Sequence, residues 1–474
     1  MTLTSPWYLL FLAAVVFICA RVPHARGRQT LVLAASWVFY ASFGVGFLPI
    51  LWLSILFGWW TIRKIATHEG AARRRWLVAS VCGSLAVLAS FKYGPHAARA
   101  LNHLFGAVDL ELDPDKFRFR FPLGISFYVF ESISYAVDVY RGKVDAPSRL
   151  RSYATFISFF PHLLAGPIVR AGRLVPQLEG LPQRATPSQR ARGVELIITG
   201  LFRKLVLGDQ LLTLAATIPT ATAGQHFVAL QALGLALTLA GVYCDFAGYT
   251  DLARGSAKLL GVELPINFRQ PLTRSRGFGD FWTRYNVTLM MWFRDYVYQP
   301  VRALLGGRRQ SWIAVIVLFA LSGLWHDAAL RWILWGLAVG SVIALERARA
   351  RRSAHRGRTT TAPRIWTTVG RPLAVDLGMI AVLIGITLIN AAISPPSEAA
   401  RAAASFRGPS VIPTVIMVLT LLGGLVAFDL AEPGLERNDG RSDYSRARTV
   451  GIAALVVAIA VFGGVARPFT YFSV

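Results

Sequence analysis

YCDFAGYTDLARGSAKLLGVELPINFRQPLTRSRGFGDFWTRYNVTLMMWFRDYVYQP, residues 243–300, is the stretch that decides how the rest of the chain is interpreted. It begins at the end of an apolar run and then mixes charged side chains with many aromatic ones. Charged groups are costly against lipid, so these side chains are expected to line a protein interior, a cavity or the membrane surface. Residues 281–300 are too polar to cross a bilayer and are predicted to form an amphipathic helix, at the interface or packed into a bundle.

The composition outside this stretch is that of a membrane protein. Of the 474 residues, 54% are hydrophobic and 16% are charged, against roughly 25% charged in an average soluble domain. The net charge is +25, and the basic residues stand in short loops between apolar runs. This arrangement indicates the positive-inside rule and attraction to anionic membrane lipids. No recognition motif accompanies the charge, so nucleic acid is not expected as a partner.

Apolar runs of the length of a membrane helix recur along the chain. The predicted fold class is an all-α, polytopic membrane helical bundle of about eleven transmembrane helices with additional short re-entrant or interfacial helices. The candidate spans lie near 5–20, 30–46, 47–62, 76–92, 121–138, 153–169, 194–217, 227–247, 311–325, 329–345, 373–393, 411–430 and 449–466. We expect one integral membrane domain, 1–474, with N-terminal helices in 1–120, a catalytic core in 121–345 and C-terminal helices in 346–474.

One histidine stands between two apolar runs. The run that reads LSGLWHD, residues 321–327, places His326 at its end, and Trp332 begins the next run almost at once. Histidine exchanges a proton near neutral pH, so His326 is a candidate general base or acid. The alternative is a structural histidine satisfied by a backbone carbonyl, and burial and placement alone favour that interpretation. The three cysteines suggest neither a disulfide framework nor a metal cluster, and no metal is expected.

Motifs along the whole chain carry a resemblance to a known family. Residues 321–328 (LSGLWHDA) resemble the histidine motif of the membrane-bound O-acyltransferase (MBOAT) family. Further stretches resemble its bacterial branch that acetylates polysaccharides, typified by the membrane subunit of alginate O-acetyltransferase; they are 121–142, 159–169 (FFPHLLAGPIV), 243–251, 281–300 and 467–472. The matches follow the family's order over nearly the whole chain, which makes the set far more specific than any single motif.

The resemblance implies catalytic roles for two residues. His326 corresponds to the family's catalytic histidine, the base that activates the acceptor hydroxyl. Asn286 falls at the second active-site position, where many bacterial members carry histidine and the branches that acylate lipids and sterols carry asparagine. An amide is not a general base, so Asn286 is expected to hydrogen-bond the acyl carbonyl or to orient the substrate. Asp327 is a second departure, because relatives usually have glycine there.

Other residues are weaker candidates for substrate binding. The candidates are Trp325, Trp282, Tyr243, Asp245, Asp251 and Arg294. Trp325 and Trp282 are expected to line the reaction chamber. Tyr243, Asp245 and Asp251 are expected either to position substrate or to stabilise a buried kink through Arg254 or Arg269. Arg294 has a second interpretation as half of a local ion pair with Asp295, and His162 is expected to be structural.

The resemblance also implies a reaction. An acyl group, acetyl in the branch resembled, passes from acyl-CoA to a hydroxyl of a cell-surface polysaccharide or related glycan, in some systems through an extracytoplasmic acetyltransferase partner. No cofactor is expected to be permanently bound, and the location implied is the bacterial inner membrane, crossed many times. Two other functions stay open. They are a transporter or flippase that does no covalent chemistry, and a non-catalytic scaffold of a polysaccharide-modifying complex.

Overall fold

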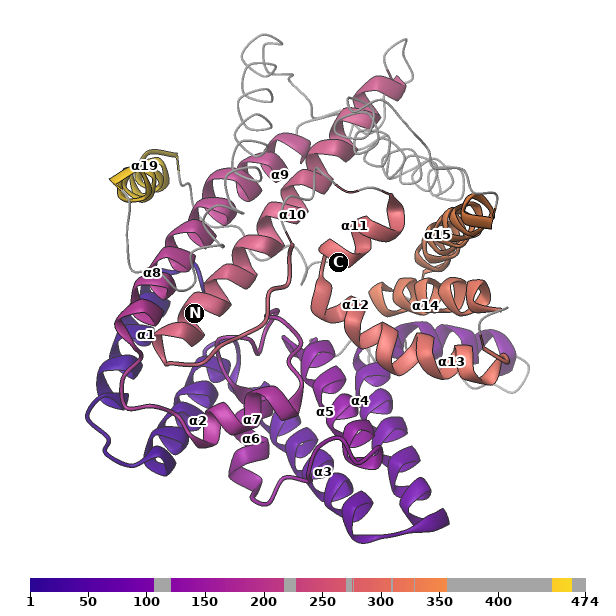
Figure 1. Ribbon diagram of the computed structural model, residues 1–474, viewed down its shortest axis with the longest axis horizontal. Coiled ribbons are helices and arrows are strands. Elements are labelled where there is room, and N and C mark those ends of the chain that lie inside the picture. The colour runs from indigo at the N-terminus through magenta and orange to yellow at the C-terminus, as the bar shows by residue number, and fades with distance from the viewer. Residues whose placement is uncertain are drawn as a thin grey trace. The chain divides into compact units, whose positions relative to one another are not determined.

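The protein is helical wherever its structure is described. The computed structural model describes residues 1–105, 121–216, 227–269, 275, 277–307, 310–327, 329–355 and 446–462. Every regular element in these ranges is a helix (Figure 1), which confirms the predicted all-helical class. The contacts divide the chain into two compact units, and the division falls within the long helix α10 (Phe227–Leu259). The single domain 1–474 stays a prediction.

The first unit contains residues 1–197 and 249–265. Its helices are α1 (Pro6–Cys19), α2 (Ala25–Ala41), η1 (Val45–Phe47), α3 (Leu48–Thr67), α4 (Gly70–Phe105), α5 (Ile125–Tyr140), α6 (Leu150–Ser158), α7 (Ala171–Glu179) and most of α8 (Pro187–Leu201). Helices α3, α4 and α5 pack against one another (Figure 1). Helix α5 is buried on nearly all its faces, which is typical of a helix at the centre of a bundle.

Aromatic packing and buried hydrogen bonds hold the ends of this unit together. The ring of Tyr8 contacts those of Phe39 and Phe160, with centroids 5.5 and 6.2 Å away. The hydroxyl groups of Tyr8 and Ser256 lie 2.9 Å apart, so the first helix is tied to the end of α10. Such a buried pair satisfies polar atoms that would otherwise be costly to bury.

Two helices in the described ranges are long and apolar enough to cross a membrane. They cover Val45–Thr67 and Gly70–Gly94, and large apolar side chains such as Leu53 and Val78 are exposed on them. Shorter apolar helices occur at Pro6–Cys19, Ser311–His326 and Gly451–Ala460. The predicted count of about eleven spans is therefore not confirmed, and the candidate spans 373–393 and 411–430 lie outside the described residues.

One predicted span is wrong. The candidate 153–169 is not a continuous helix, because α6 ends at Ser158 and a non-helical segment follows to Arg170. Pro161 and Pro167 lie in that segment, and proline removes a helical hydrogen bond and clashes with the preceding turn.

The second unit contains residues 198–248 and 266–474. Its helices are η4 (Phe202–Gly208, a π-helical turn), α9 (Asp209–Ala216), most of α10, α11 (Phe278–Arg284), α12 (Val287–Phe293), η6 (Arg294–Tyr298, also π-helical), α13 (Gln299–Leu304), α14 (Ser311–His326), α15 (Leu330–His355) and α19 (Arg446–Phe462). The prediction of one amphipathic helix over 281–300 is wrong, because the segment is broken after Arg284 and again changes to a π-helical turn at Arg294.

The helices α14 and α15 form a tightly packed hairpin (Figure 1). Three glycines lie where the two backbones are closest, so a Cβ at Gly323, Gly336 or Gly340 would meet backbone atoms of the facing helix. Small residues at such contacts let membrane helices approach closely. The close approach positions the first turn of α15 beside the last turn of α14.

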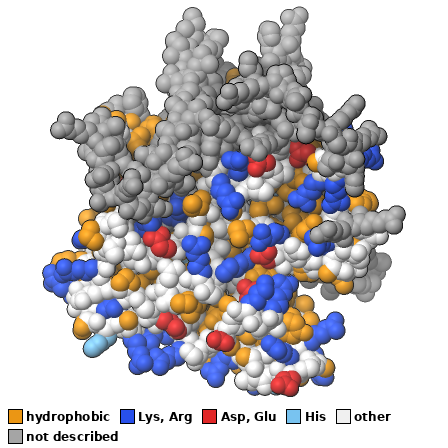
Figure 2. All heavy atoms as spheres, in the orientation of Figure 1, with side chains coloured by type: hydrophobic (Ala, Val, Ile, Leu, Met, Phe, Trp, Pro, Cys, Tyr) orange, Lys and Arg blue, Asp and Glu red, His pale blue; other side chains and the backbone are white. Residues whose placement is uncertain are grey.

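Basic side chains dominate the charged groups of the surface. On the face shown in Figure 2, Lys and Arg side chains are spread over the described part and acidic side chains are fewer. This agrees with the 50 basic and 25 acidic residues of the whole chain. A surface of this kind is attracted to anionic lipid headgroups.

Candidate active site

His326 is the last residue of α14 and lies within a cluster of tryptophans. Its ring stacks on that of Trp332, with centroids 5.1 Å apart and planes inclined by 22°. Trp335 meets the imidazole edge-on at 5.8 Å and 90°. The neighbouring ring of Trp325 lies 4.8 Å away. Because the hairpin turns directly after His326, side chains of both helices surround one imidazole that is only half buried.

Helix α11 contributes to the same cluster. Trp282 contacts Trp335 at 5.7 Å and Phe319 of α14 at 5.5 Å, both edge-on. Glu346 of α15 accepts hydrogen bonds from the backbone N–H groups of Phe278 (3.1 Å) and Gly279 (2.9 Å). A carboxylate at a helix N-terminus satisfies free N–H groups and interacts favourably with the helix dipole. The position of Trp282 is thus set by α15, the helix that also carries Trp335.

A second aromatic chain joins this cluster to the signature near residue 243. Tyr285 contacts Trp282 at 5.7 Å and Phe268 at 5.1 Å. Phe268 in turn contacts Tyr243 at 5.6 Å. Four of the residues predicted from the sequence, Tyr243, Trp282, Trp325 and His326, therefore belong to one network of rings.

Asn286 occupies an unusual backbone position beside this network. Its φ of 48° and ψ of 52° lie in the left-handed region, and it is the one non-glycine residue with positive φ in the described ranges. Asparagine tolerates this region better than most residues. The reversal ends α11 and starts α12, so the 5%-exposed side chain of Asn286 stands in the break between two short helices.

Asn267 fixes that break. Its backbone carbonyl accepts a hydrogen bond from the N–H of Val287 at 2.8 Å. Its side-chain Oδ1 accepts from the N–H of Thr288 at 3.1 Å and from the Thr288 hydroxyl at 2.8 Å. These bonds satisfy free N–H groups of the first turn of α12. Asn267 was not among the residues singled out from the sequence.

Several buried polar atoms around the tryptophan cluster have no hydrogen-bond partner among the described residues. They are Nε1 of Trp282, Nε1 of Trp332 and Oδ1 of Asn286. Most buried polar atoms in proteins are paired, because an unpaired one costs roughly 1–3 kcal/mol. Unpaired indole N–H donors in the cluster that contains His326, and an unpaired amide oxygen on the residue that follows Tyr285, indicate a place where a ligand supplies the missing bonds.

Asp245 is held by a lysine that the sequence analysis did not single out. Lys204, on the π-helical turn η4, lies 2.6 Å from Asp245 and 2.5 Å from Asp209, and all three side chains are at most 7% exposed. Gly208 of the same turn lies against the backbone of Asp245. The expected partners of Asp245 were Arg254 or Arg269. The pairing with Lys204 depends on a helical irregularity that leaves little trace in a hydrophobic pattern.

The remaining predicted binding residues lie in other settings. Asp251 belongs to the first unit and pairs with Arg254 at 3.3 Å, one of the two alternatives expected for it. Arg294 pairs with Asp295 at 2.8 Å, and its side chain is 54% exposed. This is the local ion pair expected from the sequence. Oδ2 of Asp327 lies 3.5 Å from Nη2 of Arg331, which is in the first turn of α15.

His162 has an environment unlike that of His326. Its Nε2 lies 3.0 Å from a carboxylate oxygen of Glu131, and both side chains are at most 2% exposed. Glu131 also accepts a hydrogen bond from the backbone N–H of Val169 at 3.0 Å. The pair ties α5 to the non-helical segment after α6, which agrees with the structural role expected for His162.

The described residues contain no group of three or more His, Cys, Asp or Glu side chains placed to hold a metal ion. The side chains of the tryptophan cluster and of Asn286 can supply two kinds of chemistry. The imidazole of His326 can exchange a proton, and the indole N–H and amide groups can form hydrogen bonds.

Comparison with known proteins identifies the family. The model of the MBOAT, membrane-bound O-acyltransferase family, matches residues 120–367. The chain is 35% identical over 329 residues to the "Probable alginate O-acetylase AlgI" of Azotobacter vinelandii, an alignment that covers 68% of this chain and 64% of that protein. It is 36% identical over 331 residues to the protein of the same name in Pseudomonas aeruginosa, covering 68% and 61% of the two chains.

A relative with another acceptor in its name is also similar. The peptidoglycan O-acetyltransferase of Helicobacter pylori is 31% identical over 351 residues, covering 67% of this chain and 64% of that protein. The alignments thus span about two thirds of this chain and between 61% and 64% of these relatives. With the family model matched over more than half of its length, the chain belongs to the membrane-bound O-acyltransferase family.

Proposed function

We propose that this protein is an O-acyltransferase of the bacterial inner membrane that transfers an acyl group, acetyl in the first instance, from acyl-CoA to a hydroxyl group of a cell-surface polysaccharide. The proposal is supported by the family membership and by relatives named for the acetylation of alginate and of peptidoglycan. The observation that carries it within the molecule is the tryptophan cluster that contains His326, in which the buried indole N–H groups of Trp282 and Trp332 have no hydrogen-bond partner among the described residues.

His326 acts as the general base in the proposed reaction. Its imidazole takes the proton of the acceptor hydroxyl while that oxygen attacks the thioester carbonyl. The C–S bond then breaks, and the imidazolium returns the proton to the leaving thiolate, so that an ester and free CoA are formed. The stacked ring of Trp332 and the edge-on ring of Trp335 restrict the imidazole to one orientation for both proton transfers.

The amide N–H group of Asn286 and the two indole N–H groups stabilise the charge that develops on the carbonyl oxygen. Preorganised donors in a site of low polarity contribute more than the same groups in water, because they need not reorganise during the reaction. The backbone of Asn286 is held in its reversed conformation by the neighbouring residues Val287 and Thr288, which donate hydrogen bonds to Asn267. The indoles of Trp282 and Trp332 are held by ring contacts within the hairpin. Tyr243, Trp325 and Asp245 complete the proposed binding region.

The acceptor lies outside the cytoplasm and the donor inside it. We propose that the acyl group reaches the glycan directly or through an extracytoplasmic acetyltransferase partner, and that no cofactor is permanently bound. We further propose that residues 1–474 form a single domain with its catalytic core in 121–345. The chain crosses the membrane many times.

The test uses purified full-length protein in lipid nanodiscs with radiolabelled acetyl-CoA and a panel of soluble glycans, among them alginate and peptidoglycan fragments. We expect labelled glycan and an equal amount of free CoA, and a rate of formation of both products that is lower by about 10²–10⁴-fold for a His326→Ala protein. A parallel assay in vesicles measures movement of unlabelled glycan. Movement without any transfer of label would assign the protein to transport and would contradict the proposed reaction.

A further inference from the structure

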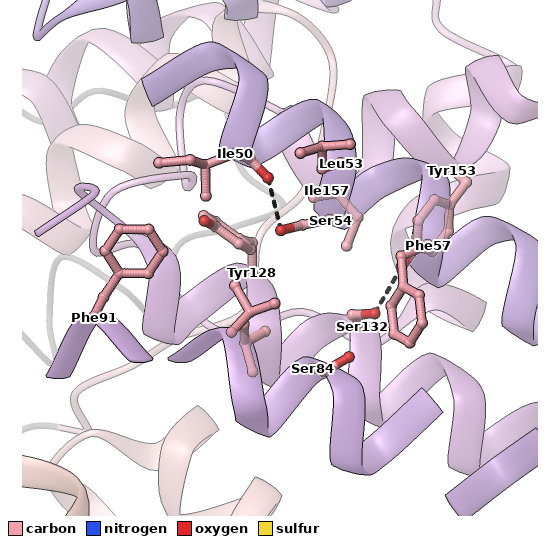
Figure 3. A pocket seen from close by; sticks show the side chains of 12 residues that line it. Ile50, Leu53, Ser54, Phe57, Ser84, Phe91, Tyr128, Ser132, Tyr153 and Ile157 are labelled. Carbon is pink, nitrogen blue, oxygen red and sulfur yellow. Dashed lines mark hydrogen bonds between the residues drawn. The ribbon is translucent and has the colours of Figure 1, made fainter. Parts of the chain in front are cut away.

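A cavity of about 460 Å³ lies within the first unit, and none of the residues that line it has a part in the proposed reaction. Its walls come from four helices, α3, α4, α5 and α6 (Figure 3). The residues that line it are Ile50, Leu53, Ser54, Phe57, Ser84, Val87, Phe91, Tyr128, Val129, Ser132, Tyr153 and Ile157. The volume falls within the range of about 300–1,000 Å³ that is usual for binding sites of small molecules.

The spacing of the lining residues gives the cavity its length. On α3 they run from Ile50 to Phe57, and on α4 from Ser84 to Phe91, each with the spacing of one helical face. Seven residues of helix rise by about 10 Å. Phe91 and Phe57 lie toward opposite ends of the cavity in Figure 3. The cavity therefore follows the two helices for about two turns, which suits an extended ligand.

The lining is apolar and carries no charge. Its polar groups are hydroxyls, and three of them are already used inside the protein. Ser54 donates to the carbonyl of Ile50 at 2.8 Å, and the hydroxyls of Ser132 and Tyr153 lie 2.8 Å apart. A buried water needs two to four polar partners to be held. The cavity thus favours hydrocarbon over water or an ionic ligand.

The position of the cavity indicates that the hydrocarbon comes from the lipid bilayer. Helices α3 and α4 are the two elements of the described ranges that are long and apolar enough to span a bilayer. Leu53 lines the cavity and is also 66% exposed, so the lining continues onto the apolar outer surface of α3. Leu56 and Leu85, on the same two helices, are exposed as well. A surface of this kind is stable only against lipid, so the cavity opens toward the acyl chains of the bilayer.

We infer that this cavity is a lipid site, which holds one acyl chain of a membrane phospholipid between α3, α4, α5 and α6. The chain enters beside Leu53 and lies along α4 past Val87 toward the hydroxyls of Ser132 and Tyr153. It fills space that would otherwise leave these four helices without contacts on one side. The site binds lipid and takes no part in the acyl transfer proposed above.

The experiment uses full-length protein in vesicles of phosphatidylethanolamine and phosphatidylglycerol that contain a phosphatidylethanolamine with a diazirine in one acyl chain. After illumination, mass spectrometry locates the labelled peptides. We expect labelling concentrated on the lining residues of α3 and α5. Val87→Phe fills the cavity and should reduce that labelling at least five-fold. Val78→Phe is the matched control, because Val78 lies on the same helix with its side chain 52% exposed, and labelling should be unchanged.

Each outcome decides the inference. Equal labelling of the Val87→Phe and Val78→Phe proteins, or labelling spread evenly over the exposed faces of α1, α3 and α4, would show only contact with bulk lipid and would overturn it. A free fatty acid with the same diazirine provides a second arm, and labelling by it alone would reject a phospholipid as the occupant. If Val87→Phe does not yield folded protein, judged by size-exclusion chromatography, Ser84→Val narrows the same cavity and takes its place.

Discussion

Two histidines of this chain lie in opposite kinds of environment. His162 is 1% exposed and is held by the carboxylate of Glu131. His326 is half buried, and tryptophan rings surround it on three sides. A carboxylate partner at full burial favours one fixed arrangement of the protons and ties two segments together. Ring contacts orient the imidazole of His326 without burying it fully. We therefore propose a stabilising role for His162 and, as part of the proposed function, a catalytic role for His326.

The strongest test of this difference between the two histidines is to remove the imidazole of His326. We expect His326→Ala to reduce acyl transfer by about 10²–10⁴-fold, the usual contribution of a general base. The amount of protein in the membrane and its thermal stability should stay close to those of the parent, since the ring is only half buried. Labelled acetyl transfer per mole of purified protein is the measurement. A transfer rate within three-fold of the parent would assign His326 a packing role.

Removal of the amide beside the cluster should have the next largest effect. Asn286→Gly is expected to reduce transfer by about 10²-fold, the lower end of the range for loss of one oxyanion donor. Glycine adopts positive φ without strain, so the backbone reversal is kept. Asn286→Ala loses the same amide and adds backbone strain, so it should be equally slow and also less stable. A normal rate for the glycine variant would remove Asn286 from the mechanism.

The other histidine is tested through its carboxylate. We expect Glu131→Ala to lower the free energy of unfolding by about 1–3 kcal/mol, because it leaves the N–H groups of His162 and Val169 buried without an acceptor. Glu131→Gln keeps an acceptor and should cost less. Thermal melting followed by size-exclusion chromatography ranks the two variants. The transfer rate per folded molecule should not change, and a selective loss of rate would show that this pair also serves the reaction.

The smallest effect is expected at the exposed ion pair of η6. Arg294→Ala should change stability by less than about 1 kcal/mol, as is usual for exposed salt bridges. Its KM for acyl-CoA should also stay within about two-fold, because the guanidinium is 54% exposed and already paired with Asp295. A ten-fold rise in KM would instead support the substrate-binding role that the sequence alone suggested for Arg294.

The helical class and the position of His326 between two helices could be predicted from the sequence, because both depend on patterns of residues that lie close together in the chain. A long apolar run that ends in Trp-His and restarts a few residues later predicts a hairpin with the histidine at its turn. The surrounding tryptophans could not be assigned to one cluster in the same way. Trp282 reaches Trp335 only because Glu346 holds the start of α11, a contact between residues 67 and 68 positions apart.

The pairing of Lys204 could not be predicted from the sequence either, because one of its two partners is far from it in the chain. Its two partners are five and 41 positions away, and they meet only because a π-helical turn shifts the direction of the side chains. The break between α11 and α12 at Asn286 could not be predicted from the sequence either. Residues 281–300 have the composition of one amphipathic helix, and the reversal depends on hydrogen bonds from Asn267, which precedes it by nineteen positions.

The reversed backbone at residue 286 also restricts what evolution can place there. In the left-handed region a β-branched or bulky side chain is strongly disfavoured, whereas asparagine, aspartate and histidine are the side chains enriched there. Apart from glycine, the backbone therefore favours few residues at this position, and those side chains carry hydrogen-bonding groups. An exchange between asparagine and histidine at this position is a step between two neighbouring solutions that the same backbone permits. The local conformation can thus persist while the chemical task assigned to the side chain diverges among descendants.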